Sequence, residues 1–171
     1  MRCFIGLEPD AKSKMAIDNW RQHALPAIEG KVPAANFHIT LAFLGQLNHS
    51  QLEQLQTTLE QATALPACSI QLNTLGYFAK PKVLFVGTDE IQPELMQLAT
   101  SVTSLTQQAG LQLRHQTYVP HVTLYRKCPS NPPAALFSPD IELQFTQFHL
   151  YESVSSSGGV RYPIINSWSL Y

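Results

Sequence analysis

The stretch FHITLAFL, residues 37–44, decides the fold, because its pattern returns in residues 118–126, YVPHVTLYR. Both stretches are short and rich in β-branched and aromatic residues, which is typical of strands. Each carries the tetrad His-aliphatic-Thr-Leu, at residues 38–41 in the first and 121–124 in the second. This repetition predicts two similar halves, each built around one tetrad strand.

Each tetrad strand closes a strand–helix–strand unit. Residues 2–8 (RCFIGLE) predict a buried strand, and Asp10 predicts the N-cap of the helix that follows it. Residues 83–87 (VLFVG) predict the corresponding buried strand of the second unit. Pro93 then suits the first turn of a second helix. The two units therefore have the same order of elements.

The remaining elements complete both halves. Ser50 and Glu53 form a capping-box pair that predicts the start of another helix. Further strands are predicted over residues 69–75, 141–151 and 160–170. The predicted order is β-α-β-α-β followed by β-α-β-β-β.

This order predicts an α+β fold that is bilobal. Two pseudo-symmetric lobes of antiparallel sheet carry helices packed outside, and the tetrads face an active-site cleft between the lobes. The length of 171 residues suits a single domain, since domains typically hold ~100–200 residues. We expect one domain over residues 1–171, with lobes at approximately 1–80 and 81–171 and with room for interleaved termini.

Composition excludes several classes of function. Lys and Arg number 11 against 12 Asp and Glu, so the chain is not a basic protein that coats nucleic acid. Cys3, Cys68 and Cys128 form no CxxC motif, which argues against a disulfide framework and fits a reducing compartment. No apolar run approaches the ~20 residues that span a bilayer. We expect a cytoplasmic protein with no membrane partner and no obligate protein partner.

Alternation along the tetrad strands separates two kinds of side chain. Successive residues of a strand point to opposite faces, so His38 and Thr40 share one face, and His121 and Thr123 do the same. The other face is apolar and includes Phe43, which we expect to pack against helices. Two imidazoles and two hydroxyls would then surround one small volume.

Such a set suits attack on a phosphodiester. A neutral imidazole can take a proton from water, while a protonated one gives a proton to the leaving oxygen. Hydroxyls can donate hydrogen bonds to oxygens on which charge grows. Zinc would require three or four protein ligands, and no carboxylate or thiol accompanies the tetrads. We therefore expect no metal and no cofactor.

The two motifs resemble a known signature. NFHITLAFLG (36–45) and PHVTLYRK (120–127) resemble the paired motifs of the 2H phosphoesterase superfamily. Within it, the chain is most similar to the bacterial and archaeal RNA 2′,3′-cyclic phosphodiesterases, historically called 2′-5′ RNA ligases. The likeness covers nearly the whole chain, from RCFIGLEP near the start to FHLYESVSSSGGVRYPIINSWSL at the end.

This resemblance implies a bilobal α+β fold and a reaction. The family opens a terminal 2′,3′-cyclic phosphate on RNA to a 2′-phosphomonoester. It implies that His38 is the proton donor to the departing 3′ oxygen and His121 the proton acceptor for water. Thr40 and Thr123 would hold phosphate oxygens, and Arg126 would contact the phosphate.

Residue spacing bears on two further substrate-binding candidates. Arg126 is five residues from His121, so strict alternation places it on the opposite face. A strand end or a β-bulge would return it to the same face. Tyr125 shares the face of His121 by alternation, and we expect it to stack on a terminal base, as aromatic residues commonly do with RNA.

Several readings of the function stay open. The expected partners are RNA 3′ ends or small cyclic-phosphate nucleotides. The same four residues would serve a 2′-5′ RNA ligase or a phosphodiesterase for another cyclic nucleotide. A non-catalytic module that binds RNA ends would need no paired acid and base. The other histidines are interpreted as surface or satisfied polar groups: His23, His49, His115 and His149.

Overall fold

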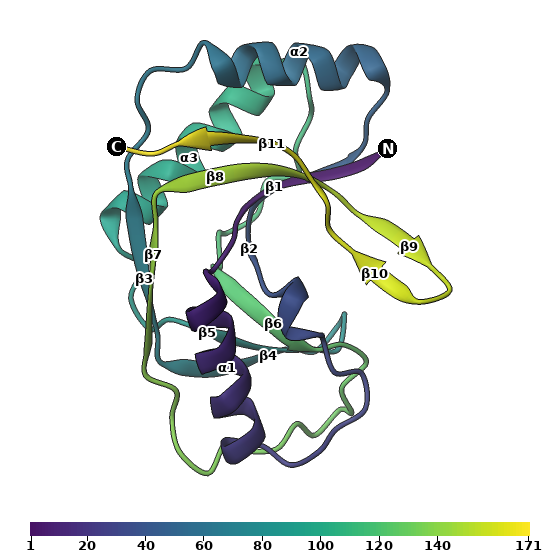
Figure 1. Cartoon of the computed structure of the whole chain (residues 1–171), viewed down its shortest axis with the longest axis vertical. Coiled ribbons are helices and arrows are strands. Elements are labelled where there is room, and N and C mark those ends of the chain that lie inside the picture. The colour runs from purple at the N-terminus through teal and green to yellow at the C-terminus, as the bar shows by residue number, and fades with distance from the viewer.

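The computed structural model describes all 171 residues and has three α-helices among eleven strands (Figure 1). Its elements run in the order β1 (Arg2–Leu7), α1 (Ala11–Ala24), a 3-10 turn η1 (Ala34–Asn36), β2 (Ile39–Gln46), α2 (His49–Glu60), β3 (Cys68–Leu72), β4 (Thr74–Phe78), β5 (Val83–Gly87), α3 (Pro93–Gln108), β6 (His121–Tyr125), β7 (Ile141–Phe145), β8 (Gln147–Glu152), β9 (Val154–Ser156), β10 (Gly159–Arg161) and β11 (Ile164–Ser169).

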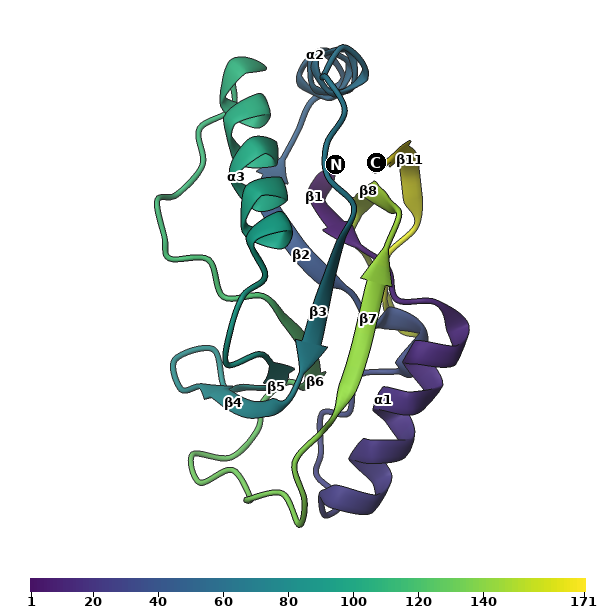
Figure 2. The same cartoon turned by 90° about the vertical axis from the view of Figure 1, so that its left-hand side faces the viewer.

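Two antiparallel sheets form the two lobes. One sheet has four strands in the order β11-β8-β1-β2, and the other has three in the order β4-β5-β6. The strands β3 and β7 pair with each other and run between the two lobes (Figure 2). The short hairpin β9–β10 projects from the four-stranded sheet (Figure 1). The predicted α+β class with two lobes of antiparallel sheet is confirmed.

The lobes do not divide at residue 80 as predicted. The four-stranded sheet combines β1 and β2 with β8 and β11, which come from opposite ends of the chain. Helix α3, from the second half, packs against β2 of the first half. The chain changes lobe each time it passes along β3 and β7, so each lobe is assembled from both halves of the sequence.

Apolar residues at helical spacing predict one buried stripe on each helix, and these stripes supply the core. Ile17, Trp20 and Ala24 are buried on α1, as are Leu52, Leu55 and Leu59 on α2. They belong to one contiguous cluster of 35 buried residues that draws on both lobes. A shared core explains how two sheets of few strands hold a fixed position relative to each other.

The N-cap of helix α2 lies two residues before the predicted one. The side chain of Asn48 accepts a hydrogen bond from the Gln51 amide at 2.8 Å, and the Gln51 side chain accepts one from the Asn48 amide at 2.9 Å. Asn48 is therefore the N-cap, instead of Ser50 with Glu53. The sequence offers two overlapping capping boxes, and the earlier one lengthens the helix by half a turn.

Two strands predicted as continuous are each broken in the middle. Asn73 separates β3 from β4, and Thr146 separates β7 from β8. At both points the chain leaves the β3–β7 pair and enters a different sheet. Each break is a single residue between two strands, so the apolar pattern of the sequence reads as one strand.

Phe43 does not pack against helices as predicted. The pairing of β2 with β1 shifts register twice, which leaves Leu41 and Leu44 without direct partners. These are β-bulges, and an extra residue reverses the alternation that follows it. Phe43 consequently pairs with Phe4 on the face of the sheet away from α3, where 64% of Phe43 is exposed.

Candidate active site

The two tetrad histidines have the same local arrangement. His38 directly precedes β2, and His121 begins β6. Nδ1 of His38 lies 2.8 Å from the carbonyl oxygen of Asn36, and Nδ1 of His121 lies 2.7 Å from that of Val119. A carbonyl only accepts, so each Nδ1 carries a proton and each Nε2 is free to bond elsewhere.

The tetrad strands meet where the lobes join. Tyr118, just before β6, donates a hydrogen bond from its hydroxyl to the Thr40 carbonyl oxygen at 3.1 Å. Thr123 pairs with Phe85, whose ring lies 5.1 Å from that of His121, so Thr123 shares the face of this histidine. The predicted set of two histidines and two threonines is therefore brought together from two sheets.

Aromatic rings enclose both imidazoles. The rings of Phe4 and Tyr162 each lie 4.8 Å from that of His38 between centroids. Phe78 and Phe85 lie 5.0 and 5.1 Å from His121. Sequence reasoning missed these neighbours, since they come from separate strands and loops. They leave each imidazole only partly exposed to water.

This enclosure lowers the pKa of both histidines. Burial is the main reason why the pKa of His38 falls to about 4, and the charges of Arg126 and His121 act in the same direction. The hydrogen bond to Asn36 opposes this shift. Burial and then Arg126 also lower the pKa of His121. Both imidazoles are thus predominantly neutral at pH 7 in the free protein.

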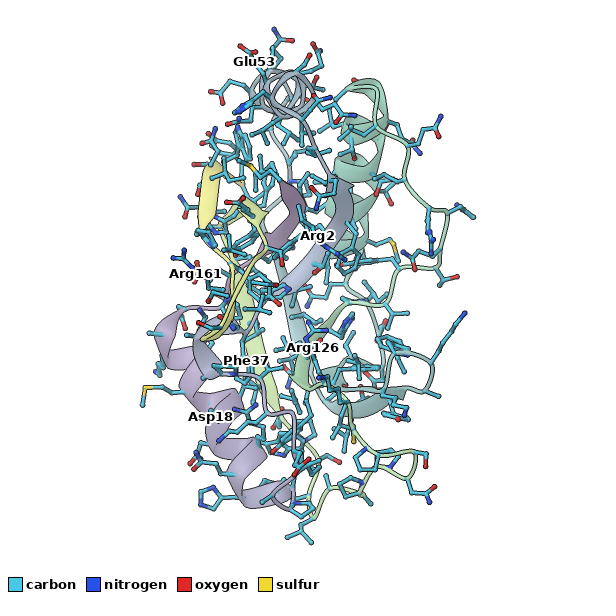
Figure 3. The ribbon with its side chains drawn as sticks, turned by 90° about the vertical axis from the view of Figure 1, so that its right-hand side faces the viewer. Arg2, Asp18, Phe37, Glu53, Arg126 and Arg161 are labelled. Carbon is cyan, nitrogen blue, oxygen red and sulfur yellow. The ribbon has the colours of Figure 1, made fainter.

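A bulge returns Arg126 to the face of the histidines. The pairing of β6 with β5 shifts register between Thr123 and Tyr125, which leaves Leu124 without a direct partner. The extra residue reverses the alternation of side chains after it, so Arg126 lies on the same face as His121. The charge of Arg126 acts on the pKa of both histidines, which agrees with this placement. Figure 3 labels Arg126 beside the end of β6.

The same bulge removes Tyr125 from the site, contrary to the prediction. Tyr125 is only 4% exposed, and its ring lies 5.5 Å from the guanidinium carbon of Arg21 on the core side. The alternation that would have placed Tyr125 beside His121 is reversed after the bulge residue Leu124. Tyr125 is therefore not available to stack on a base.

Arg21 is a buried cation that sequence reasoning did not single out. Its Nη1 donates to the carbonyl oxygens of Leu124 at 3.0 Å and Val32 at 2.8 Å, and its Nη2 pairs with Asp18 at 2.6 Å. The carbonyl of Leu124 belongs to the bulge, so Arg21 stabilises the turn that positions Arg126. The sequence feature that could have identified Arg21 is its position on the apolar stripe of α1, where a charged residue is unusual.

His149 lies on the sheet face of Thr40, because Gly6 pairs with both residues. The imidazole of His149 is buried in the four-stranded sheet, and its Nδ1 lies 2.7 Å from the Ser167 hydroxyl. No group of three or more His, Cys, Asp or Glu residues is arranged to hold a metal ion. None of the three helices combines the length and the hydropathy needed to span a bilayer.

The bilobal fold and the two facing tetrads are those of a 2H phosphoesterase. Residues 8–156 match the model of the 2′-5′ RNA ligase superfamily, and the chain belongs to this family. The RNA 2′,3′-cyclic phosphodiesterase of Escherichia coli K12 is 28% identical, over 99% of this chain and 96% of the relative. An enzyme of the same name from Archaeoglobus fulgidus is 27% identical, over 95% and 96%.

Solved structures agree with this assignment. A crystal structure described as a phosphoesterase superposes with a TM-score of 0.90 at 27% identity, covering 99% of this chain and 97% of the other. The structure of E. coli LigT complexed with 3′-AMP gives a TM-score of 0.86 at 27% identity, with the same coverage.

Proposed function

We propose that this protein is an RNA 2′,3′-cyclic phosphodiesterase, an enzyme that opens the cyclic phosphate at an RNA 3′ end to a 2′-phosphomonoester. One observation carries the proposal: two histidines, close enough for the charge of one to act on the other, each bind a carbonyl oxygen through Nδ1 and leave Nε2 without a hydrogen bond. Relatives with this name match almost the full chain.

His121 is the proposed general base. Its Nδ1–H is held by the Val119 carbonyl, so Nε2 of the neutral ring has a lone pair for a water proton. The lowered pKa keeps the ring in this neutral state at pH 7. The water oxygen then forms a bond to phosphorus, and its proton passes to Nε2.

His38 is the proposed general acid. As the bond from phosphorus to the 3′ oxygen breaks, Nε2–H of protonated His38 gives its proton to that oxygen. The free site disfavours this protonated form, because the pKa of His38 is about 4. An anionic phosphate beside the ring favours the charged imidazole and raises its pKa. Binding of the substrate therefore promotes protonation of His38.

Thr40, Thr123 and Arg126 complete the proposed site. The threonine hydroxyls donate hydrogen bonds to the nonbridging oxygens, on which negative charge grows during attack. The guanidinium of Arg126 supplies a cation on the same side. Acid, base and charge stabilisation are then all supplied by side chains, and no step of the proposed reaction requires a metal.

Ligation is a second candidate, favoured by the family's description as 2′-5′ RNA ligases. In that reaction an RNA hydroxyl replaces water as the nucleophile, and the same histidines transfer the protons. A non-catalytic module would use neither free Nε2 atom. RNA 3′ ends and small cyclic-phosphate nucleotides remain the proposed partners.

The test is turnover of a dinucleotide that ends in a 2′,3′-cyclic phosphate, with the product identified by phosphorus NMR. We expect a 2′-phosphomonoester, formed at the same rate with and without excess EDTA. A 3′-phosphomonoester would contradict the assigned leaving oxygen. Loss of turnover in EDTA, restored by one added metal, would contradict the metal-independent mechanism.

A further inference from the structure

The sheet face that carries Thr40 continues beyond the tetrad toward the ends of β1 and β2. Antiparallel partners lie on the same face of a sheet, so Phe43 lies beside Phe4, and Gln46 beside Arg2. The ring of Phe4 contacts His38, at 4.8 Å between centroids. We call Phe43, Gln46 and Arg2 the rim strip, because they extend outward from the site.

The rim strip has the composition of a surface for single-stranded nucleic acid. Phe43 is 64% exposed, whereas its neighbour Phe4 is 5% exposed. Neither β1 nor β2 contains an acidic residue, and Glu152, which pairs with Cys3, is directed to the opposite face. Exposed aromatic rings stack bases and nearby cations attract the phosphates, without a sequence preference.

Position on the sheet relates the strip to the scissile phosphate. Two residues along a strand span about 6.6 Å, so Phe43 is one such step from Thr40 and Arg2 is two. In Figure 3, Arg2 and Arg126 are labelled along the middle of one side of the molecule, while Arg161 lies at its edge. Arg2 thus adds a cation to the strip, in addition to Arg126, whose charge acts on both histidines.

We propose that the rim strip binds the RNA chain leading away from the cyclic phosphate, with one base stacked on Phe43 and the next phosphodiester against Arg2. This inference rests on the proposed function. A mononucleoside cyclic phosphate has no phosphodiester to meet Arg2, whereas a dinucleotide has one. The strip therefore makes the enzyme prefer RNA ends over small cyclic nucleotides.

The experiment measures kcat/KM on a dinucleotide ending in a 2′,3′-cyclic phosphate and on a mononucleoside 2′,3′-cyclic phosphate. Phe43→Ala lowers kcat/KM on the dinucleotide by about 5- to 150-fold, the range of one base–aromatic stack, and Phe43→Tyr retains it. Arg2→Gln lowers the dinucleotide value alone and weakens its dependence on salt. The control is Phe137→Ala, in the loop before β7, where the phenylalanine is 51% exposed. This variant keeps kcat/KM unchanged on both substrates.

Unchanged kcat/KM on the dinucleotide in Phe43→Ala and Arg2→Gln overturns the proposal, as does an equal loss on both substrates in Arg2→Gln. Failure of the proposed function is distinct, because the wild type would then hydrolyse neither substrate. In that case, the rim strip is tested by fluorescence anisotropy, which measures binding of a labelled trinucleotide that bears a terminal 2′-phosphate. Weaker binding by both variants supports the strip, and unchanged binding overturns it.

Discussion

The His38 and His121 regions share one local geometry but differ in their surroundings. Each imidazole donates Nδ1–H to the carbonyl two residues upstream. His38 also faces Tyr151, at 6.2 Å between ring centroids, in addition to its two nearer rings. Burial takes the pKa of His38 to about 4. Equal backbone geometry thus fixes the direction of each ring, while packing decides how readily each holds a proton.

The two regions are also supported in different ways. Before His38, Lys14 donates to the Ala35 carbonyl at 2.9 Å, and the Asn36 side chain donates to the Val160 carbonyl at 2.8 Å. The turn that orients His38 is therefore tied to α1 and to the hairpin β9–β10. The His121 strand is held at its far end instead, through the bulge at Leu124 and the guanidinium of Arg21.

The largest expected effect tests whether the two histidines are equally necessary. His38→Ala and His121→Ala should each lower kcat by about 10²-fold or more, since each removes one proton transfer. The double variant should lose little more than either single variant, because the two residues act in one step. Near-normal turnover by either variant, with unchanged circular dichroism, would contradict the assignment.

Arg21→Met should disturb the support of the His121 region. It removes the donor to the Leu124 and Val32 carbonyls, and it should lower the free energy of unfolding by about 1–3 kcal/mol. Activity should fall as well, because the bulge that directs Arg126 loses a hydrogen bond. Urea denaturation measures the first effect, and exposed Arg114→Met is the matched control. Equal stability of the two variants would show that Arg21 does not stabilise the His121 region.

The pH profile should show the lowered pKa values. The protonated fraction of His38 falls as pH rises above about 4, and the neutral fraction of His121 falls as pH drops below its own lowered pKa. The profile of kcat/KM should be bell-shaped, with its optimum below the ordinary histidine pKa of ~6.5. The two apparent pKa values belong to the coupled pair.

Arg126→Gln sharpens the same measurement. Loss of its charge raises the pKa of both histidines, so the whole profile should move to higher pH while the maximum falls. Lys127→Gln, one residue away, is the control. A profile that keeps its position in Arg126→Gln would show that burial alone sets these pKa values.

The smallest expected effect concerns the start of α2, remote from both histidines. Asn48→Ala should destabilise the protein by about 1 kcal/mol, the usual value for an N-cap, whereas Ser50→Ala should change stability little. Thermal unfolding distinguishes them. Turnover per folded molecule should stay constant in both variants, which separates general stability from the difference between the two histidine regions. The reverse order of stabilities would support the capping pair Ser50–Glu53.

Local sequence determined the elements and the four proposed catalytic positions. The spacing of apolar residues indicated the stripes of all three helices, and alternation over His38 to Thr40 and His121 to Thr123 placed each pair on one face. These features depend on residues a few positions apart, so they do not depend on which distant strands pair.

Only the tertiary structure decided the course of each strand beyond its tetrad. The bulges at Leu41, Leu44 and Leu124 arise where a strand pairs with a partner that is distant in the sequence, and no pattern within the strand indicates them. One extra residue buries Tyr125 and brings Arg126 to the histidines. Phe43 is likewise turned outward, since register is a property of two strands and not of one.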